Sequence, residues 1–171
     1  MGRATWDTGW FQAEIFKQLL QRLGYTVNGP HTYDNEGFYT AAAAGDVDLW
    51  VNGWFPLHNT FLERDDIAGQ LEPVGFEVQG GSLQGYLVDK ATADARNITS
   101  LEDFKRPDVV DAFDPDGDGR ANLIGCNEGW GCEAIVEHHL DAYNLRPTVE
   151  HVQGDYGPLM MNTIQQYEAG Q

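Results

Sequence analysis

Residues 126–133 read Cys-Asn-Glu-Gly-Trp-Gly-Cys-Glu and run directly into residues 134–143, where apolar side chains recur at intervals of three to five residues. That spacing predicts an amphipathic helix, which Asn144 and Pro147 are expected to end. Glu137 faces away from its predicted apolar face, as does Asp141. The face itself consists of Ile135, Val136, His139, Leu140 and Tyr143. The stretch therefore indicates a glycine-rich loop held at the start of a helix.

Two kinds of ligand chemistry meet in this loop. The first helical turn leaves backbone N–H groups free at about Gly131, Cys132 and Glu133, and the helix dipole makes that end attractive to an anion such as a carboxylate. Trp130 offers an electron-rich face that attracts cations. An anion site beside a cation site suits a zwitterion. The alternative is that Trp130 is a core residue, but glycine on both sides argues against a core position.

Cys126 and Cys132 are the two cysteines of the chain. Their spacing is short enough for a disulfide, which would fix the loop, contribute about 2 kcal/mol and imply an exported protein. Free buried thiols are a second interpretation. A cysteine nucleophile is a third, although the neighbouring residues match no cysteine-hydrolase motif.

Length and composition limit the classes of protein. With 171 residues and an apolar fraction of 42%, the chain can fold as one domain or two small lobes. It has 27 acidic and 10 basic residues, a formal charge of −17 and a pI near 4.3, which argues against nucleic acid and anionic membrane surfaces as partners. No apolar stretch reaches the roughly 20 residues of a membrane span. Residues 1–5 lack a signal-peptide apolar region, so we expect any export signal to lie outside this sequence.

Helices and strands alternate upstream of the loop. The predicted elements are a helix over residues 9–23, a strand over 25–27, a helix over 35–44 and a strand over 47–51. Thr8 is expected to cap the first helix, Asn35 to cap the second, and Trp50 to lie in the core. The apolar face of the first helix carries Phe11, Ile15, Leu19 and Leu23. This alternation predicts an α/β fold with a largely parallel sheet.

The loop at 52–58, Asn-Gly-Trp-Phe-Pro-Leu-His, follows the last of these strands. In an open α/β sheet ligands lie beyond the carboxyl ends of the strands, so this loop is expected to meet a ligand. Pro56 suits the first turn of a short helix, which places His58 one turn below Trp54. Trp54 would then offer a second face to a cation, and His58 a hydrogen bond to an anion. A solvated loop histidine is an equal alternative for His58.

The second half of the chain continues the alternation. Strands are predicted over residues 74–78, 84–88 and 148–152, and helices over 107–113 and 158–170. The glycine-rich link at 79–82 is the expected crossing between two lobes. Ser100 and Asp103 are spaced as in a capping box that opens a further helix.

An acidic, glycine-rich stretch at 114–122 suggests a calcium loop. Asp114, Asp116 and Asp118 occupy the first, third and fifth positions, and Asn122 occupies the ninth. The twelfth position is Gly125, where a bidentate glutamate is expected, so the match is incomplete. The alternative is a turn closed by hydrogen bonds to the aspartate side chains.

Five segments together resemble one known family. They are Leu-Gly-Tyr-Thr-Val at 23–27, Gly-Trp-Phe-Pro-Leu-His at 53–58, Gln-Gly-Tyr-Leu-Val-Asp-Lys at 84–90, Asp-Gly-Asp-Gly-Arg-Ala-Asn-Leu at 116–123 and Gly-Cys-Asn-Glu-Gly-Trp-Gly-Cys-Glu at 125–133. The chain resembles the glycine betaine/proline betaine-binding proteins of ABC importers, the ProX type, over essentially its whole length. The segments at 53–58 and 125–133 are the specific ones.

The resemblance implies a periplasmic-binding-protein-like fold of type II, with two lobes and mainly parallel sheets. The first lobe is expected over residues 1–83 and the second over 84–171. Trp54 and Trp130 would be walls of an aromatic cage around a quaternary ammonium. The carboxylate would be bound by His58 and the backbone N–H groups of Gly131 and Cys132. Cys126 and Cys132 would form the disulfide.

The function implied is that of a non-catalytic, monomeric receptor. It would capture glycine betaine or a related zwitterion as an osmoprotectant and pass it to an ABC permease outside the cytoplasm, in the periplasm of some cells. Choline, carnitine and ectoine are alternative ligands. A calcium-stabilised protein-interaction module is the alternative from another class, and an enzyme using Cys132 is the least favoured hypothesis.

One departure from the family pattern affects binding. The family takes a third cage tryptophan from a segment that would follow residue 171, and the first strand also looks clipped, so we expect a fragment truncated at both ends that binds betaine weakly or not at all. Trp6 or Trp10 could replace the missing ring. Packing at the helix start is the favoured explanation for both.

Overall fold

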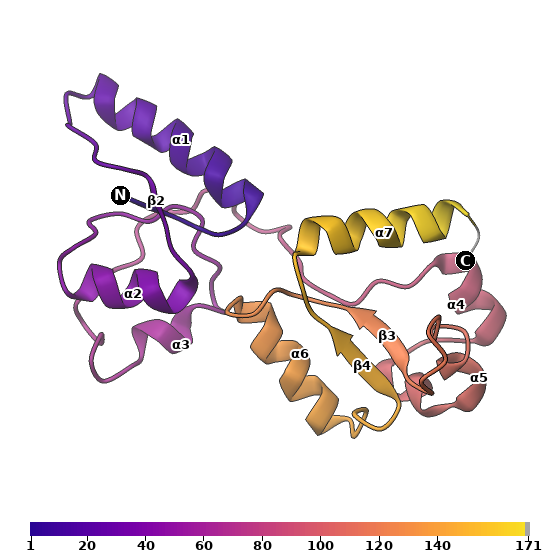
Figure 1. Ribbon diagram of the computed structural model, residues 1–171. Coiled ribbons are helices and arrows are strands. Elements are labelled where there is room, and N and C mark those ends of the chain that lie inside the picture. The colour runs from indigo at the N-terminus through magenta and orange to yellow at the C-terminus, as the bar shows by residue number, and fades with distance from the viewer. Residues whose placement is uncertain (170–171) are drawn as a thin grey trace. The chain divides into compact units, whose positions relative to one another are not determined.

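The computed structural model describes residues 1–169, and its fold is mixed α/β, with helices and small parallel sheets. The chain divides into two compact units, Met1–Leu83 and Gln84–Gln171, which are described one at a time (Figure 1). Among the described residues, no helix combines the length and the apolar character required to cross a membrane.

Unit 1 is built around one very short parallel pair of strands. Its elements are β1 (Gly2–Arg3), α1 (Asp7–Arg22), β2 (His31–Thr32), α2 (Asn35–Ala43) and α3 (Asn59–Leu62). β1 pairs with β2 with Gly2 opposite His31, and a parallel bridge joins Gly2 to Trp50 on the other side. Residues 47–51, predicted as a strand, therefore contribute a single bridge, although Val47 and Val51 are buried as a core strand requires.

The core of unit 1 lies beneath α2. Phe38, Tyr39 and Ala42 of that helix pack with Val47 and Ile67. The ring of Trp50 packs on this cluster as expected, with its centroid 4.3 Å from that of Phe38. The cap of α2 is Asp34, whose Oδ1 accepts a hydrogen bond from the Gly37 N–H at 2.6 Å, and the predicted cap Asn35 is the first helical residue.

The predicted inward face of α1 was wrong. The helix begins at Asp7 with Trp6 at the N-cap, so Thr8 lies inside it, and its buried residues are Gly9 and Ala13. Small residues allow the helix to approach β1 closely, because a Cβ on Gly9 would lie 2.6 Å from the Ala4 Cβ. The four residues predicted to face inward are exposed: Phe11, Ile15, Leu19 and Leu23.

Three further predicted strands are absent from the described residues, at 25–27, 74–78 and 84–88. A strand requires a neighbour for its backbone N–H and C=O groups, and the alternation of side chains in one segment does not supply that neighbour. An alternating, β-type sequence was therefore not sufficient for these segments to form strands.

Unit 2 contains a parallel βαβ arrangement. Its elements are α4 (Lys90–Arg96), the 3₁₀ helix η1 (Leu101–Lys105), α5 (Pro107–Val110), β3 (Ala121–Ile124), α6 (Gly131–Ala142), β4 (Val149–Val152) and α7 (Tyr156–Glu168). β3 and β4 are parallel over four residue pairs, from Ala121 opposite Val149 to Ile124 opposite Val152. Helix α6 contacts β4 and helix α7 contacts β3 (Figure 1).

The helix after the cysteine loop follows its predicted course. Val136 and Leu140 are buried with Ala121, Leu145 and Val149, whereas the predicted face residues Ile135 and Tyr143 are partly exposed. Asn144 ends α6 in the left-handed conformation, with φ 52°. Glu137, predicted to face away from the apolar face, is half-buried and makes polar contacts.

The Glu137 carboxylate joins two parts of unit 2. It accepts a hydrogen bond from the Arg146 guanidinium at 2.7 Å, and its other oxygen lies 2.7 Å from His151 Nδ1 on β4. These hydrogen bonds, first from His151 and then from Arg146, hold the Glu137 pKa below its usual value.

The remaining predicted boundaries in unit 2 shift by a few residues. The capping box is present, with Asp103 Oδ2 accepting from the Ser100 N–H at 3.0 Å, but it opens a 3₁₀ helix. Helix α5 stops at Val110, before the predicted end at 113. Helix α7 begins at Tyr156, two residues before Pro158, and the predicted stop Gly170 lies outside the described residues.

Candidate functional site

Trp54 lies in the loop that leaves the core of unit 1. It is half-buried, and its indole Nε1–H donates a hydrogen bond to the Asn52 side-chain oxygen at 2.8 Å. Asn52 is buried and adopts the left-handed backbone conformation, with φ 72°. Asparagine tolerates that conformation better than most residues do, so this position suits it.

A second indole reaches the same asparagine. Trp6 Nε1–H donates to the Asn52 Oδ1 at 2.6 Å, and the ring of Trp6 meets Trp50 edge-on at a centroid distance of 6.1 Å. Trp10 is held differently: its Nε1–H donates to the Ala4 carbonyl at 2.6 Å, and the Arg3 guanidinium lies 4.8 Å from its ring. The two N-terminal tryptophans therefore have different surroundings.

His58 is a buried, neutral side chain. It is 1% exposed, its Nδ1 lies 3.0 Å from the Tyr39 hydroxyl, and the Trp54 N–H donates to the same nitrogen at 3.4 Å. Burial lowers the pKa of His58 to about 4 and raises that of Tyr39 well above its ordinary value. Because a backbone N–H can only donate, Nδ1 accepts and the proton of the neutral imidazole sits on Nε2. The alternative of a solvated loop histidine was wrong.

Trp130 is the N-cap of α6 and has an aromatic neighbour from α7. Its ring centroid lies 5.6 Å from that of Tyr156, and both residues are tied to Asn127. The Trp130 N–H donates to the Asn127 carbonyl at 3.1 Å, and the Tyr156 N–H donates to the Asn127 side-chain oxygen at 3.0 Å. Gly129 has φ 81°, so the turn before the tryptophan requires the freedom of glycine.

The start of α6 differs in one respect from the prediction. The Gly131 and Cys132 N–H groups donate no hydrogen bond within the part of the chain described, whereas the Glu133 N–H donates to the Trp130 carbonyl at 3.1 Å. The Glu133 carboxylate folds back, accepting from the Gly129 N–H at 2.8 Å and from Gln153 Nε2 at 3.0 Å. Two amide donors are therefore available at this helix start, not three.

The disulfide joins Cys126 and Cys132, with an S–S distance of 2.04 Å and a Cα–Cα distance of 6.0 Å. It closes a small ring that contains Trp130 and Gly131. The ring connects the end of β3 to the first turn of α6, so the two amide donors and the tryptophan belong to one covalently closed loop.

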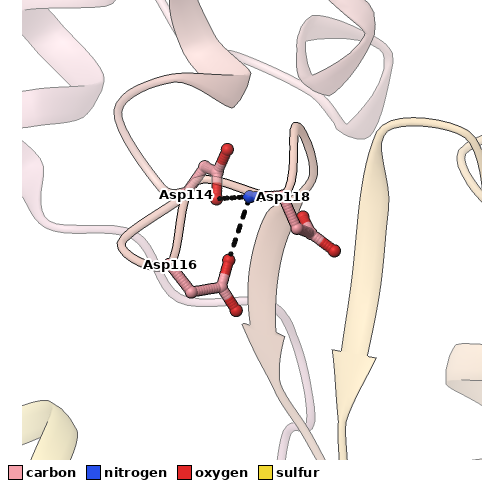
Figure 2. A group of neighbouring side chains, drawn as sticks. All are labelled: Asp114, Asp116 and Asp118. Carbon is pink, nitrogen blue, oxygen red and sulfur yellow. Dashed lines mark hydrogen bonds between the residues drawn. The ribbon is translucent and has the colours of Figure 1, made fainter.

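Figure 2 shows the three aspartates of the acidic loop together, with ligand atoms within 4.8 Å of one another. Asp114 accepts hydrogen bonds from the N–H groups of Gly117 at 2.7 Å and Gly119 at 2.8 Å. Partial burial alone would raise the pKa of Asp114, but these bonds bring it below its usual value. Asp118 binds the Arg120 guanidinium at 2.5 Å.

Asn122, the fourth expected metal ligand, and Gly125, at the twelfth loop position, contact other parts of the protein. Asn122 lies in β3, where its N–H donates to the Phe113 carbonyl at 2.7 Å. Gly125 lies against the His151 ring. A Cβ added at this position would fall 1.8 Å from His151 Nε2. A glutamate therefore cannot occupy position 125 in this packing.

The predicted site residues fall into two groups. Trp54 and His58 lie together in unit 1, and Trp130, Gly131 and Cys132 lie together in unit 2. Sequence reasoning missed the residues that hold them: Asn52, Tyr39, Asn127 and Tyr156. Two of these could have been recognised in the sequence, since Asn52 directly precedes Gly53-Trp54 and Tyr156 is an aromatic residue beside Gly157.

Comparison with known proteins gives one family. A family model described as the substrate-binding domain of ABC-type glycine betaine transport systems matches residues 1–171. The glycine betaine/proline betaine-binding periplasmic protein of Escherichia coli is 42% identical over 160 residues, which is 94% of this chain and 48% of that protein. The glycine betaine-binding periplasmic protein OusX of Dickeya dadantii is 40% identical over the same shares. The chain thus spans about half the length of the curated relatives it matches.

Proposed function

The chain belongs to the substrate-binding domains of ABC-type glycine betaine transport systems, and we propose that it captures glycine betaine, proline betaine or a closely related zwitterion for an importer. The proposal includes a permease as its membrane partner and a location outside the cytoplasm. It includes no chemical step on the ligand.

The start of α6 is the observation that carries this proposal. Trp130 caps the helix between two glycines, and the N–H groups of Gly131 and Cys132 point from the same turn without another partner among the described residues. An aromatic face and two amide donors at one helix terminus match the two ends of a small zwitterion. The disulfide between Cys126 and Cys132 holds this turn in place.

Unit 1 supports the same ligand class. Trp54 supplies a half-buried indole whose orientation is set by Asn52. His58 is uncharged at neutral pH, so it offers the carboxylate of a ligand a hydrogen bond from Nε2 and no positive charge. A neutral donor suits a ligand whose own cation already balances its carboxylate.

The chemistry of betaine explains why rings are used. A trimethylammonium has no N–H group, and its charge is spread over methyl groups, so it gains little from a carboxylate acceptor. Aromatic faces provide dispersion and cation–π attraction together, about 2 kcal/mol per ring where water is excluded. Ammonium ions with N–H groups lose hydrogen bonds to water in such a site and are discriminated against.

The test is tryptophan fluorescence during parallel titrations with glycine betaine, proline betaine and choline. We expect the two betaines to change the emission and choline to act more weakly, because choline has no carboxylate for the Gly131 and Cys132 amides. Trp130→Ala should abolish the response, whereas the control Trp10→Ala should keep it. Because this chain is expected to bind betaine weakly or not at all, the titration is repeated on a version as long as the relatives it matches. An equal response to choline, carnitine or ectoine would reassign the ligand, and no response of that longer version to any of them would overturn the proposal.

A further inference from the structure

We propose that the outer edge of β3 and residues 84–88 form a slot for one further β-strand, supplied by polypeptide that follows α7 in a protein as long as the relatives. The strand would pair with β3 on the side away from β4. The slot lies within unit 2, and the inference does not depend on the identity of the ligand.

A cavity occupies this position in unit 2. It has a volume of about 80 Å³ and mainly apolar walls, and residues 86–88 line it together with residues 121–123 of β3. Protein interiors rarely contain voids larger than a water molecule. Leu87, one of the lining residues, is 95% exposed. A cavity beside an exposed leucine therefore indicates the place of another packing element.

Backbone groups on both sides of the cavity are open to pairing. Alternate residues of a strand direct their N–H groups to opposite edges, so Gly125 donates to Val152 of β4 at 3.2 Å, whereas Asn122 donates outward to the Phe113 carbonyl at 2.7 Å. The Ile124 N–H points to the same outer edge and has no acceptor in residues 1–169. Within that range, the backbone of residues 84–88 also makes no hydrogen bond.

The side chain of Asn122 provides a further sign of a missing donor. Asn122 lines the cavity, and its Oδ1 atom is buried without a hydrogen-bond partner in the described part of the chain. Buried amide oxygens nearly always accept a hydrogen bond in native structures. A strand in the slot would bring backbone N–H groups to this side of β3.

The path of the chain leads to the same place. β3 and β4 are parallel and joined through α6, and α7, which follows β4, contacts β3 (Figure 1). A crossover helix that returns over β3 delivers the next parallel strand beyond β3, because such connections keep one hand. Relatives of which this chain spans 48% have further polypeptide to supply it. Since strands inside parallel sheets are apolar on both faces, we expect a run of about five residues rich in Val, Ile and Leu.

Amide hydrogen exchange followed by NMR tests the pairing, in this chain and in a version as long as its relatives. We expect the Ile124 amide to exchange about 100-fold or more slowly in the longer version, while Gly125, which is bonded to β4, is protected in both. Alternate amides of residues 84–88 should gain protection as well. An Ile124 amide that exchanges at the same rate in both versions would overturn the proposal. Protection of Ile124 in this chain that rises with protein concentration would also overturn it, by assigning the slot to a second copy.

A variant of Leu87 provides the second measurement. Leu87 is 95% exposed here, so Leu87→Asp should change the Tm of this chain by less than about 2 °C. In the longer version the strand would cover this position, and the unpaired carboxylate should lower the Tm by about 5 °C or more. Ala95→Asp, at an exposed position of α4, is the control and should act equally in the two versions. Equal effects of Leu87→Asp in the two versions would contradict burial by a strand.

Discussion

At neutral pH the buried imidazole of His58 is uncharged, and unit 1 depends on its staying so. Its pKa lies at about 4 in the folded chain, because of burial, against an ordinary value near 6.5 in the unfolded chain. The unfolded chain therefore binds more protons between these values, and stability is lost as the pH falls through them. We expect the free energy of unfolding to decrease by about 2 kcal/mol from this residue between pH 6.5 and pH 5.

Urea denaturation at several pH values measures that loss. The variant His58→Gln should show a flatter dependence than the wild type in this window, and the imidazole of His58 should titrate near pH 4 by NMR. Equal slopes for wild type and variant would contradict a buried neutral histidine.

Gly125 illustrates a residue whose role became visible only in three dimensions. Gly125→Ala places a methyl group 1.8 Å from His151 Nε2, so we expect a loss of about 3 kcal/mol or more in the free energy of unfolding. His151→Ala alone is destabilising because it breaks the bond to Glu137. The double variant should be no less stable than His151→Ala, since the ring that clashes is gone. Fully additive losses would show that the clash is not the cause.

At the scale of single residues, the sequence proposed candidate binding residues but did not predict the side chains that surround them. Flanking glycines made Trp130 a candidate ligand contact, and its place in the loop after a buried segment made Trp54 one. The burial of His58 could not be predicted, because it depends on Tyr39 and Phe61, whose rings surround it from α2 and α3. The link between Trp6 and Asn52 joins distant positions and leaves no local pattern.

Helix α1 provides a test in which packing opposes helix propensity. In an exposed helix, Gly→Ala gains about 1 kcal/mol. At Gly9 the new Cβ would lie 2.6 Å from the Ala4 Cβ, so we expect Gly9→Ala to lose about 1–2 kcal/mol overall. Thr8→Ala is the control next to it: Thr8 is exposed inside the helix, and its removal should change stability by only a few tenths of a kcal/mol. A loss near 1 kcal/mol in Thr8→Ala would restore Thr8 as the cap.

The sequence left two hypotheses open for the acidic loop at residues 114–122: a calcium site, and a turn closed by hydrogen bonds to aspartate side chains. We expect Asp114→Ala to lower the Tm equally in EDTA and in millimolar calcium, because backbone N–H groups of the loop bind its carboxylate directly. Asp65→Ala, in another exposed acidic stretch, is the control. A wild-type Tm that rises with calcium, and a variant that no longer responds, would instead support the calcium site with Asp116 and Asp118.

Elements formed by local periodicity were predicted well, and those that need a distant partner were not. α6 follows from its apolar spacing, and β4 was predicted as a strand over residues 148–152, whereas β3, its partner, was not predicted. The inward face of α1 was mispredicted because large apolar residues were expected to be inside, whereas Gly9 and Ala13 permit the close approach. The short strands of unit 1 consist of two residues each, below the length at which alternation is informative.

The proposed function makes one prediction for each unit of the molecule. We expect Trp54→Ala and Trp130→Ala each to weaken glycine betaine binding about tenfold or more, because each variant removes a proposed aromatic contact. Isothermal titration calorimetry with glycine betaine measures both, with Trp10→Ala as the control. A variant that binds as tightly as the wild type would remove that residue from the proposed set. These candidate residues were predicted from motifs, but their supporting hydrogen bonds required the fold.

The covalent ring at residues 126–132 has a consequence for when capture is possible. The amides of Gly131 and Cys132, which we propose to bind the ligand, belong to that ring, so reduction of the disulfide would release the turn that carries them. Under the proposed function, capture would then depend on an oxidising compartment, and a copy in a reducing compartment would bind the ligand more weakly.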